Sequence, residues 1–136
     1  MESVLFATPD ATDAPYHVRL EEVLEDLIVG YYAMTAENTV RMLEQNKHIS
    51  LAIVDHTFHE ALKMTKTNAR IIVTSADFTY EMALEAIKDG AAFMNKNPLT
   101  YFGEMADLIL ANLPKPDNPS SSALEVNGQL PVAKIA

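Results

Sequence analysis

The stretch ISLAIVDHTF, residues 49–58, decides how the rest of the chain is interpreted. Its apolar run from Leu51 to Val54 has no polar alternation, and Asp55 ends it with a charge. A short uninterrupted apolar run is typical of a strand buried on both faces, as in a parallel sheet covered by helices. The carboxylate would then lie at the carboxyl edge of the sheet, where open α/β sheets bind ligands. Taken alone, an Asp at this point more often starts a loop or caps the next helix.

The composition limits the classes of function. The chain has 136 residues, enough for one domain with its own core and a tail. The formal charge of −9 argues against direct binding of nucleic acid, and the absence of cysteine excludes disulfides and Cys-ligated zinc. No apolar run reaches membrane-spanning length, and residues 1–10 predict a strand rather than a signal peptide. We therefore expect a cytoplasmic protein without a membrane segment.

Apolar runs alternate with helical patterns along the chain. Besides the strand that ends at Asp55, strands are expected at 3–7, 31–34, 71–73 and 91–94. Helices are expected from Tyr16 to Gly30, over 35–46, 59–64 and 79–89, and from Leu99 to Leu113. In the fourth helix the residues expected to face inward are Ala83, Leu84, Ala86 and Ile87. Strands and helices that alternate through short connections predict an α/β fold with a doubly wound parallel sheet.

The composition changes after residue 113. Residues 114–136 begin with three closely spaced prolines, followed by a serine run and an Asn-Gly pair. Such a segment buries little apolar surface, so we expect a flexible C-terminal tail or linker. The sequence thus predicts one folded domain over residues 1–113.

Polar side chains follow the expected strands where each strand ends. They are Thr8 and Asp10, then Asp55, then Thr74 and Ser75, and finally Asn95, Lys96 and Asn97. Because the carboxyl ends of parallel strands meet at one edge, these groups are expected to converge. Such a set could hold a phosphoryl group on Asp55, with a hydroxyl donating to a phosphoryl oxygen and the lysine neutralising charge. A divalent ion held by Asp10 and Asp55 would offset the remaining charge.

Four strings, in the right order and spacing, resemble the receiver domain of two-component response regulators, the CheY-like family, over residues 3–113. They are GYYAMTAEN (30–38), ISLAIVD (49–55), IIVTSA (71–76) and ALEAIKDGAAFMNKNP (83–98). The resemblance implies a flavodoxin-like sheet with strand order 2-1-3-4-5 and helices on both faces. It also implies a signalling module rather than an enzyme.

The resemblance further implies roles for particular residues. Asp55 would accept a phosphoryl group from a phosphohistidine, with Ser75 and Lys96 beside it and Mg²⁺ at the site. Ser75 and Thr74 would then report the phosphate, and Phe93 would turn inward, biasing a two-state equilibrium. The implied partners are a histidine kinase or phosphotransfer protein and an output or regulatory protein. The output protein would bind the face of the fourth helix, fifth strand and fifth helix, a face that also allows a homodimer.

The sequence also departs from the family pattern. Thr8-Pro9 stand where the family has paired magnesium-binding acids, which leaves Asp10 as the only acid that follows at once. The Met-Pro and Gly that usually follow the phosphorylated aspartate are absent, and the third helix is shortened. Either Asn97 or, after a one-residue shift, Lys96 takes the family's lysine position, and the shift is preferred because it also aligns Phe93. Pro98 would then follow a cis bond, as the family implies.

These departures favour an atypical receiver, a pseudo-receiver that acts mainly by protein–protein interaction, with weak or absent Mg²⁺-dependent phosphorylation at Asp55. A fully phosphorylatable receiver is the alternative. A flavodoxin-like binder of a small ligand is a minor alternative, because residues 8–13 are acidic and lack the glycines that cradle phosphate.

His56 and His59, next to Glu60, suggest a metal site, but their spacing is not that of zinc proteases and surface positions are favoured.

Overall fold

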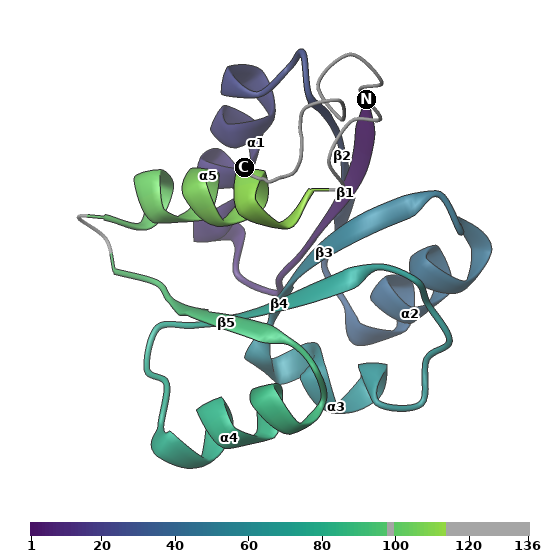
Figure 1. The fold of residues 1–136 in the computed structure, drawn as a ribbon, viewed down its shortest axis with the longest axis vertical. Coiled ribbons are helices and arrows are strands. Elements are labelled where there is room, and N and C mark those ends of the chain that lie inside the picture. The colour runs from purple at the N-terminus through teal and green to yellow at the C-terminus, as the bar shows by residue number, and fades with distance from the viewer. Residues whose placement is uncertain (98–99, 114–136) are drawn as a thin grey trace, which may run out of the picture.

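The computed structural model describes residues 1–97 and 100–113, and Figure 1 shows their arrangement. The predicted tail (114–136) and the predicted cis bond at Pro98 lie outside the described residues. The strands are β1 (Glu2–Ala7), β2 (Ile28–Ala33), β3 (Ile49–Asp55), β4 (Arg70–Ser75) and β5 (Ala92–Asn95). They form one parallel sheet in the order β2-β1-β3-β4-β5, which confirms the predicted fold class and strand order.

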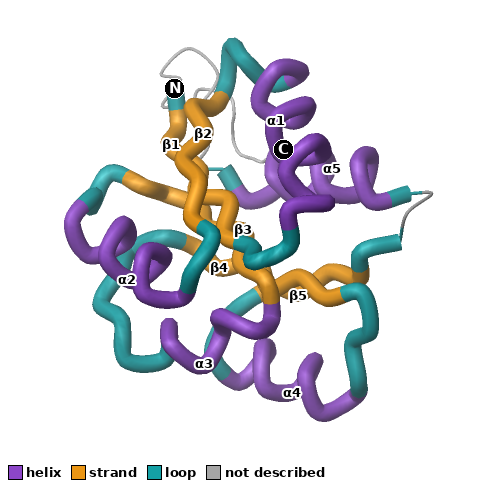
Figure 2. Tube along the Cα trace, turned by 180° about the vertical axis from the view of Figure 1, so that it is seen from behind, coloured by secondary structure: helices purple, strands orange, loops and turns teal. Residues whose placement is uncertain are grey.

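Helices cover both faces of this sheet. The α-helices are α1 (Ala14–Val23), α2 (Ala36–Gln45), α3 (His59–Leu62), α4 (Tyr80–Lys88) and α5 (Tyr101–Asn112). Two short 3-10 helices, η1 (Ala11–Asp13) and η2 (His56–Phe58), precede α1 and α3. Helices α1 and α5 lie on one face, and α2, α3 and α4 on the other (Figures 1 and 2). The third helix is short, as predicted, and its four residues end at Leu62, two residues before the expected end.

The core is divided by the sheet. Along β1, Val4 and Phe6 join the cluster under α1 and α5, whereas Leu5 and Ala7 join the cluster under α2 and α3. The run 51–54 of β3 divides in the same way. Both faces of the central strands are therefore buried, which is why these strands read as uninterrupted apolar runs.

The first helix ends earlier than predicted. Helix α1 stops at Val23, and Gly30 lies within β2 rather than at a helix end. The carboxylate of Glu21 accepts a hydrogen bond from the Gly30 amide at 2.7 Å, and a Cβ on Gly30 would lie 2.9 Å from that carboxylate. The Glu21 side chain of α1 thus covers the edge strand at Gly30, so this glycine belongs to the sheet and does not end the helix.

The prediction for the fourth helix was wrong in part. Only Ala86 is buried on α4, where it packs with Val73 and Ala91, whereas Leu84 and Ile87 are 37% and 59% exposed. The helix ends as predicted near Gly90, whose φ of +77° is the left-handed conformation that glycine adopts without strain. Among residues 1–97 and 100–113, no helix is long and apolar enough to cross a membrane.

Candidate functional site

Asp55 lies at the carboxyl end of β3 and is 5% exposed. Its Oδ1 accepts a hydrogen bond from Lys96 Nζ at 2.7 Å. Its Oδ2 accepts from the Thr57 amide at 3.1 Å and from the Thr57 hydroxyl at 2.6 Å. Asp55 therefore caps the short helix η2, one of the two roles expected for it. It also forms an ion pair at the carboxyl edge of the sheet, the position expected for a ligand-binding carboxylate.

Lys96 follows β5 and reaches back across the sheet edge. Its amide donates to the Ser75 carbonyl at 2.8 Å, which anchors the backbone beside β4. Its ammonium lies 2.7 Å from Asp55 Oδ1 and 2.6 Å from Asp13 Oδ2, with the side chain only 12% exposed. Of the two candidates for the lysine position, Lys96 is thus the residue whose side chain meets Asp55.

Asp13 is the acid that the sequence pattern did not single out. It ends η1, is 6% exposed, and its Oδ2 accepts from the Thr8 hydroxyl at 2.7 Å as well as from Lys96. The acidic residues between Asp10 and Asp26 suggest a solvated helix face with its approach loop, and for Asp13 that interpretation is wrong. Pro15 marks the start of α1, so the acid just before it could have been placed near the end of β1.

Asp10, the acid expected beside Asp55, points elsewhere. Its side chain is exposed and accepts from the Thr12 amide at 2.9 Å and from the Thr12 hydroxyl at 2.7 Å, which caps η1. These hydrogen bonds hold the pKa of the Asp10 carboxyl below its usual value. The turn that Asp10 caps carries the chain to Asp13, which takes the inward position.

The hydroxyl and aromatic residues named from the sequence lie on β4 and β5. Thr74 pairs in register with Asp55, and both Thr74 and Ser75 are buried. The Ser75 hydroxyl accepts from the Asp77 amide at 3.1 Å. Phe93 is 40% exposed, and its ring centre lies 5.2 Å from that of Phe78.

Asp13, Asp55 and Lys96 form a cluster of charged groups at this edge of the sheet, and their contacts shift the pKa values of Asp55 and Lys96. Burial raises the pKa of Asp55, but hydrogen bonds from Lys96 and Thr57 outweigh it, so this pKa lies below its usual value. Burial lowers the pKa of Lys96, but hydrogen bonds to Asp13 and Asp55 raise it above its usual value. At neutral pH one ammonium therefore serves two carboxylates.

This arrangement does not fit the Mg²⁺ site expected from Asp10 and Asp55. Mg²⁺ requires octahedral oxygen ligands at about 2.1 Å, whereas both inward carboxylates are hydrogen-bonded to the Lys96 ammonium. Within residues 1–97 and 100–113, no group of three acidic, histidine or cysteine side chains is placed to hold a metal ion. His56 and His59 face different acids: His56 Nδ1 lies 3.5 Å from Asp55 Oδ2, and His59 Nε2 lies 3.1 Å from Asp89 Oδ2.

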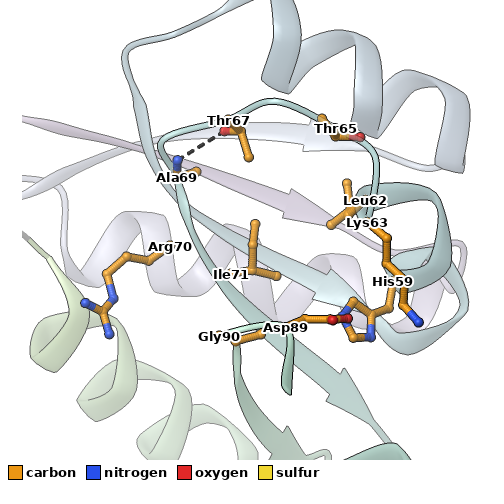
Figure 3. A pocket seen from close by; sticks show the side chains of 11 residues that line it. His59, Leu62, Lys63, Thr65, Thr67, Ala69, Arg70, Ile71, Asp89 and Gly90 are labelled. Carbon is orange, nitrogen blue, oxygen red and sulfur yellow. Dashed lines mark hydrogen bonds and ion pairs between the residues drawn. The ribbon is translucent and has the colours of Figure 1, made fainter. Parts of the chain in front are cut away.

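Two cavities help to locate the site. One of about 450 Å³ lies at the opposite edge of the sheet, where β4 and β5 begin, and Figure 3 shows the loop that borders it, with the Thr67 hydroxyl bonded to the Ala69 amide. A smaller cavity of about 280 Å³ borders the cluster of Asp13, Asp55 and Lys96, called the acidic cluster below. Its lining includes Asp13, Lys96 and Tyr101. The charged side chains that could take part in chemistry therefore lie at the smaller cavity.

No family model matches the sequence, and no curated protein matches it by sequence. Solved structures do match the fold. A response regulator from Hahella chejuensis is 15% identical, with 83% of this chain and 96% of that chain covered and a TM-score of 0.70. A CheY-like receiver domain from Methanospirillum hungatei is 17% identical, with 82% and 96% covered and a TM-score of 0.62.

A response regulator from Burkholderia pseudomallei is described with a phosphorylated aspartic acid, a calcium ion and citrate. It is 19% identical, with 82% of this chain and 72% of that chain covered and a TM-score of 0.57. At such low sequence identity, these matches establish the fold but not the roles of individual residues. The chain therefore has the five-stranded fold of response-regulator receiver domains.

Proposed function

We propose that this chain is a signalling domain of the receiver type in a two-component phosphorelay, and that it acts mainly by protein–protein interaction. Phosphorylation at Asp55 is weak or absent in this proposal. The observation that carries it is the position of the Lys96 ammonium between Asp13 Oδ2 and Asp55 Oδ1. The receiver fold supports the class of protein, and this ion cluster supports the atypical behaviour.

The contacts of Asp55 oppose phosphoryl transfer. In such a transfer an Asp55 oxygen would bond to phosphorus as the bond from phosphorus to the donor's histidine nitrogen breaks. Both oxygens are already engaged, Oδ1 by Lys96 and Oδ2 by Thr57. The new phosphoryl charge would also lie beside Asp13, and among the described residues Lys96 is the only lysine or arginine that forms an ion pair with either carboxylate. We therefore expect the carboxylate to react slowly.

An exposed apolar surface on α4 and β5 is suited to binding a protein partner. The exposed side chains Tyr80, Leu84 and Ile87 lie on α4, and Phe93 lies on the neighbouring β5. Apolar side chains gathered on adjacent elements favour a protein contact, because their burial against a partner removes them from water. We assign this surface to an output or regulatory protein, to the histidine kinase or phosphotransfer protein of the pathway, or to a second copy of the chain.

Acetyl phosphate with Mg²⁺ tests the proposal. The full chain is incubated with both, and its intact mass is measured beside that of an Asp55→Asn control. We expect no gain in mass, or a gain in a small fraction of molecules. A gain in most molecules that disappears in Asp55→Asn would overturn the proposal and favour the alternative, a fully phosphorylatable receiver.

A beryllofluoride titration gives a second readout. Beryllofluoride mimics an aspartyl phosphate without requiring transfer, so it separates slow chemistry from a site that cannot hold the group. We expect the amide spectrum of residues around Asp55 to remain unchanged when beryllofluoride and Mg²⁺ are added. Saturable shifts at Ser75 and Phe93 would contradict a phosphate-independent domain.

A further inference from the structure

A third cavity, also of about 280 Å³, lies between α1, the end of β1 and the edge strand β2. Its lining is mostly apolar and includes Phe6, Val18, Tyr32 and Met34. Phe6 is fully buried, whereas the other three are 41% to 57% exposed, so the cavity has a buried floor and an open mouth. An apolar cavity of about 150 Å³ is already large enough to hold benzene. The space therefore suits a molecule of about one aromatic ring.

His17 lines this cavity and has an unmet hydrogen bond. Its side chain is 2% exposed, and its ring is stacked on Phe6 with the ring centres 4.7 Å apart. Nε2 pairs with the Tyr101 hydroxyl at 3.2 Å, but Nδ1 is buried and has no partner among the described residues. An unpaired buried nitrogen costs about 1–3 kcal/mol, a cost that a suitable ligand would remove.

The chemistry of the missing partner follows from the tautomers of His17. Burial lowers the pKa of His17 to about 4, so the imidazole is neutral at pH 7. In a neutral imidazole one nitrogen donates and the other accepts, and the Tyr101 hydroxyl can satisfy Nε2 in either role. Nδ1 is then either an unpaired acceptor or an unpaired donor. A hydroxyl group can serve both cases, because it donates and accepts.

The rim of the cavity limits the charge of the ligand. The exposed carboxylate of Asp10 is part of the lining, and it disfavours an anion. The lining residues include no lysine or arginine that would bind one. We propose that this cavity binds a small, uncharged, mostly apolar molecule of about one ring that bears a hydroxyl group, with the ring against Phe6 and Tyr32 and the hydroxyl on His17 Nδ1. Because Nδ1 is covered in this structure, the imidazole must turn slightly to meet the hydroxyl.

The cavity is linked to the acidic cluster through one side chain. Thr8 lines the cavity, and its hydroxyl donates to Asp13 Oδ2, the oxygen that also accepts from Lys96. A bound molecule would therefore lie one hydrogen bond from the cluster. The binding itself requires no phosphorylation of Asp55, so it can be tested whether or not Asp55 reacts.

Phenol and toluene are matched probes, because they share the ring and differ in one substituent, a hydroxyl group in phenol and a methyl group in toluene. Each is titrated into the full chain, and binding is followed by shifts of the Val18 and Met34 methyl signals. We expect saturable binding of phenol, about 3- to 10-fold tighter than that of toluene, the size of one net hydrogen bond. In His17→Phe the two affinities should become equal.

Val18→Trp fills the mouth and is expected to abolish binding of both probes. Val23→Trp is its control, because Val23 is 51% exposed on the same helix and does not line the cavity. Both positions are exposed, so these variants remain informative if His17→Phe folds poorly. The proposal is overturned if phenol shifts do not saturate, if phenol and toluene bind equally well to the parent chain, or if Val18→Trp binds phenol like Val23→Trp.

Discussion

Replacing Lys96 with methionine should destabilise the fold because it leaves two inward carboxylates without their cation. In the structure the Lys96 ammonium lies 2.6 Å from Asp13 Oδ2 and 2.7 Å from Asp55 Oδ1. The two oxygens are therefore at most 5.3 Å apart, the sum of those distances. Two unit charges about 5 Å apart repel by about 3 kcal/mol at an effective dielectric constant of about 20. Breaking a buried ion pair typically costs about 3–5 kcal/mol, so both routes give a similar magnitude.

Urea unfolding at pH 7 measures this loss. We expect Lys96→Met to lower the free energy of unfolding by about 3 kcal/mol. The double variant Lys96→Met/Asp13→Asn should recover most of it, because only one of the two charges then remains. Lys63→Met is the control: this lysine contacts Glu60 and Glu85 on the surface, where water screens the charges, and its loss should be clearly smaller.

The pH dependence gives an independent check of the same physics. In the parent the pKa of Asp55 is lowered, so the ion pair contributes above the ordinary carboxyl pKa and is lost as the pH falls through the folded value. In Lys96→Met, burial and the neighbouring carboxylate should raise the pKa of Asp55. The difference in stability between parent and variant should therefore narrow below neutral pH. A loss under about 1 kcal/mol at pH 7, or a double variant no more stable than the single one, would refute the assignment of Lys96 as the shared counter-ion.

Three further predictions concern the fold. Burial lowers the pKa of His17 from 6.5 to about 4, so the unfolded chain binds more protons between these values. The free energy of unfolding should fall by about 2 kcal/mol from pH 7 to pH 5 through this residue, and His17→Phe should remove that part of the slope. Met105→Ala removes a fully buried side chain of α5 and should cost about 2–5 kcal/mol in urea unfolding. Thr35→Ala removes the oxygen that accepts from the Asn38 amide at the start of α2 and should cost about 1 kcal/mol, whereas Thr35→Asp should retain most of the stability in the same assay.

The sequence alone was sufficient for the features that depend on local pattern. The run 51–54 predicts a strand buried on both faces, and β3 is such a strand because helices cover both sides of it. The second helix, expected over 35–46, is found at Ala36–Gln45, with Thr35 capping its start and the Asn46 side chain donating to the Met42 carbonyl at its end. Placing Asp55 at the sheet edge needed nothing beyond the length of its strand.

Only the tertiary structure decided which groups meet Asp55 and what they do to it. Asp10 and Asp13 are both acids after the same strand, and the turn η1 between them turns one outward and the other inward. The inward position of Asp13 depends on Thr8, five residues away, and on Lys96, 83 residues away. The contact of Gly30 is likewise tertiary: it lies within β2, where its amide donates to the Glu21 carboxylate of α1. A hydrophobic pattern records the burial of a segment, because burial is shared by many neighbours, but a single hydrogen bond between distant side chains leaves no periodic trace in the sequence.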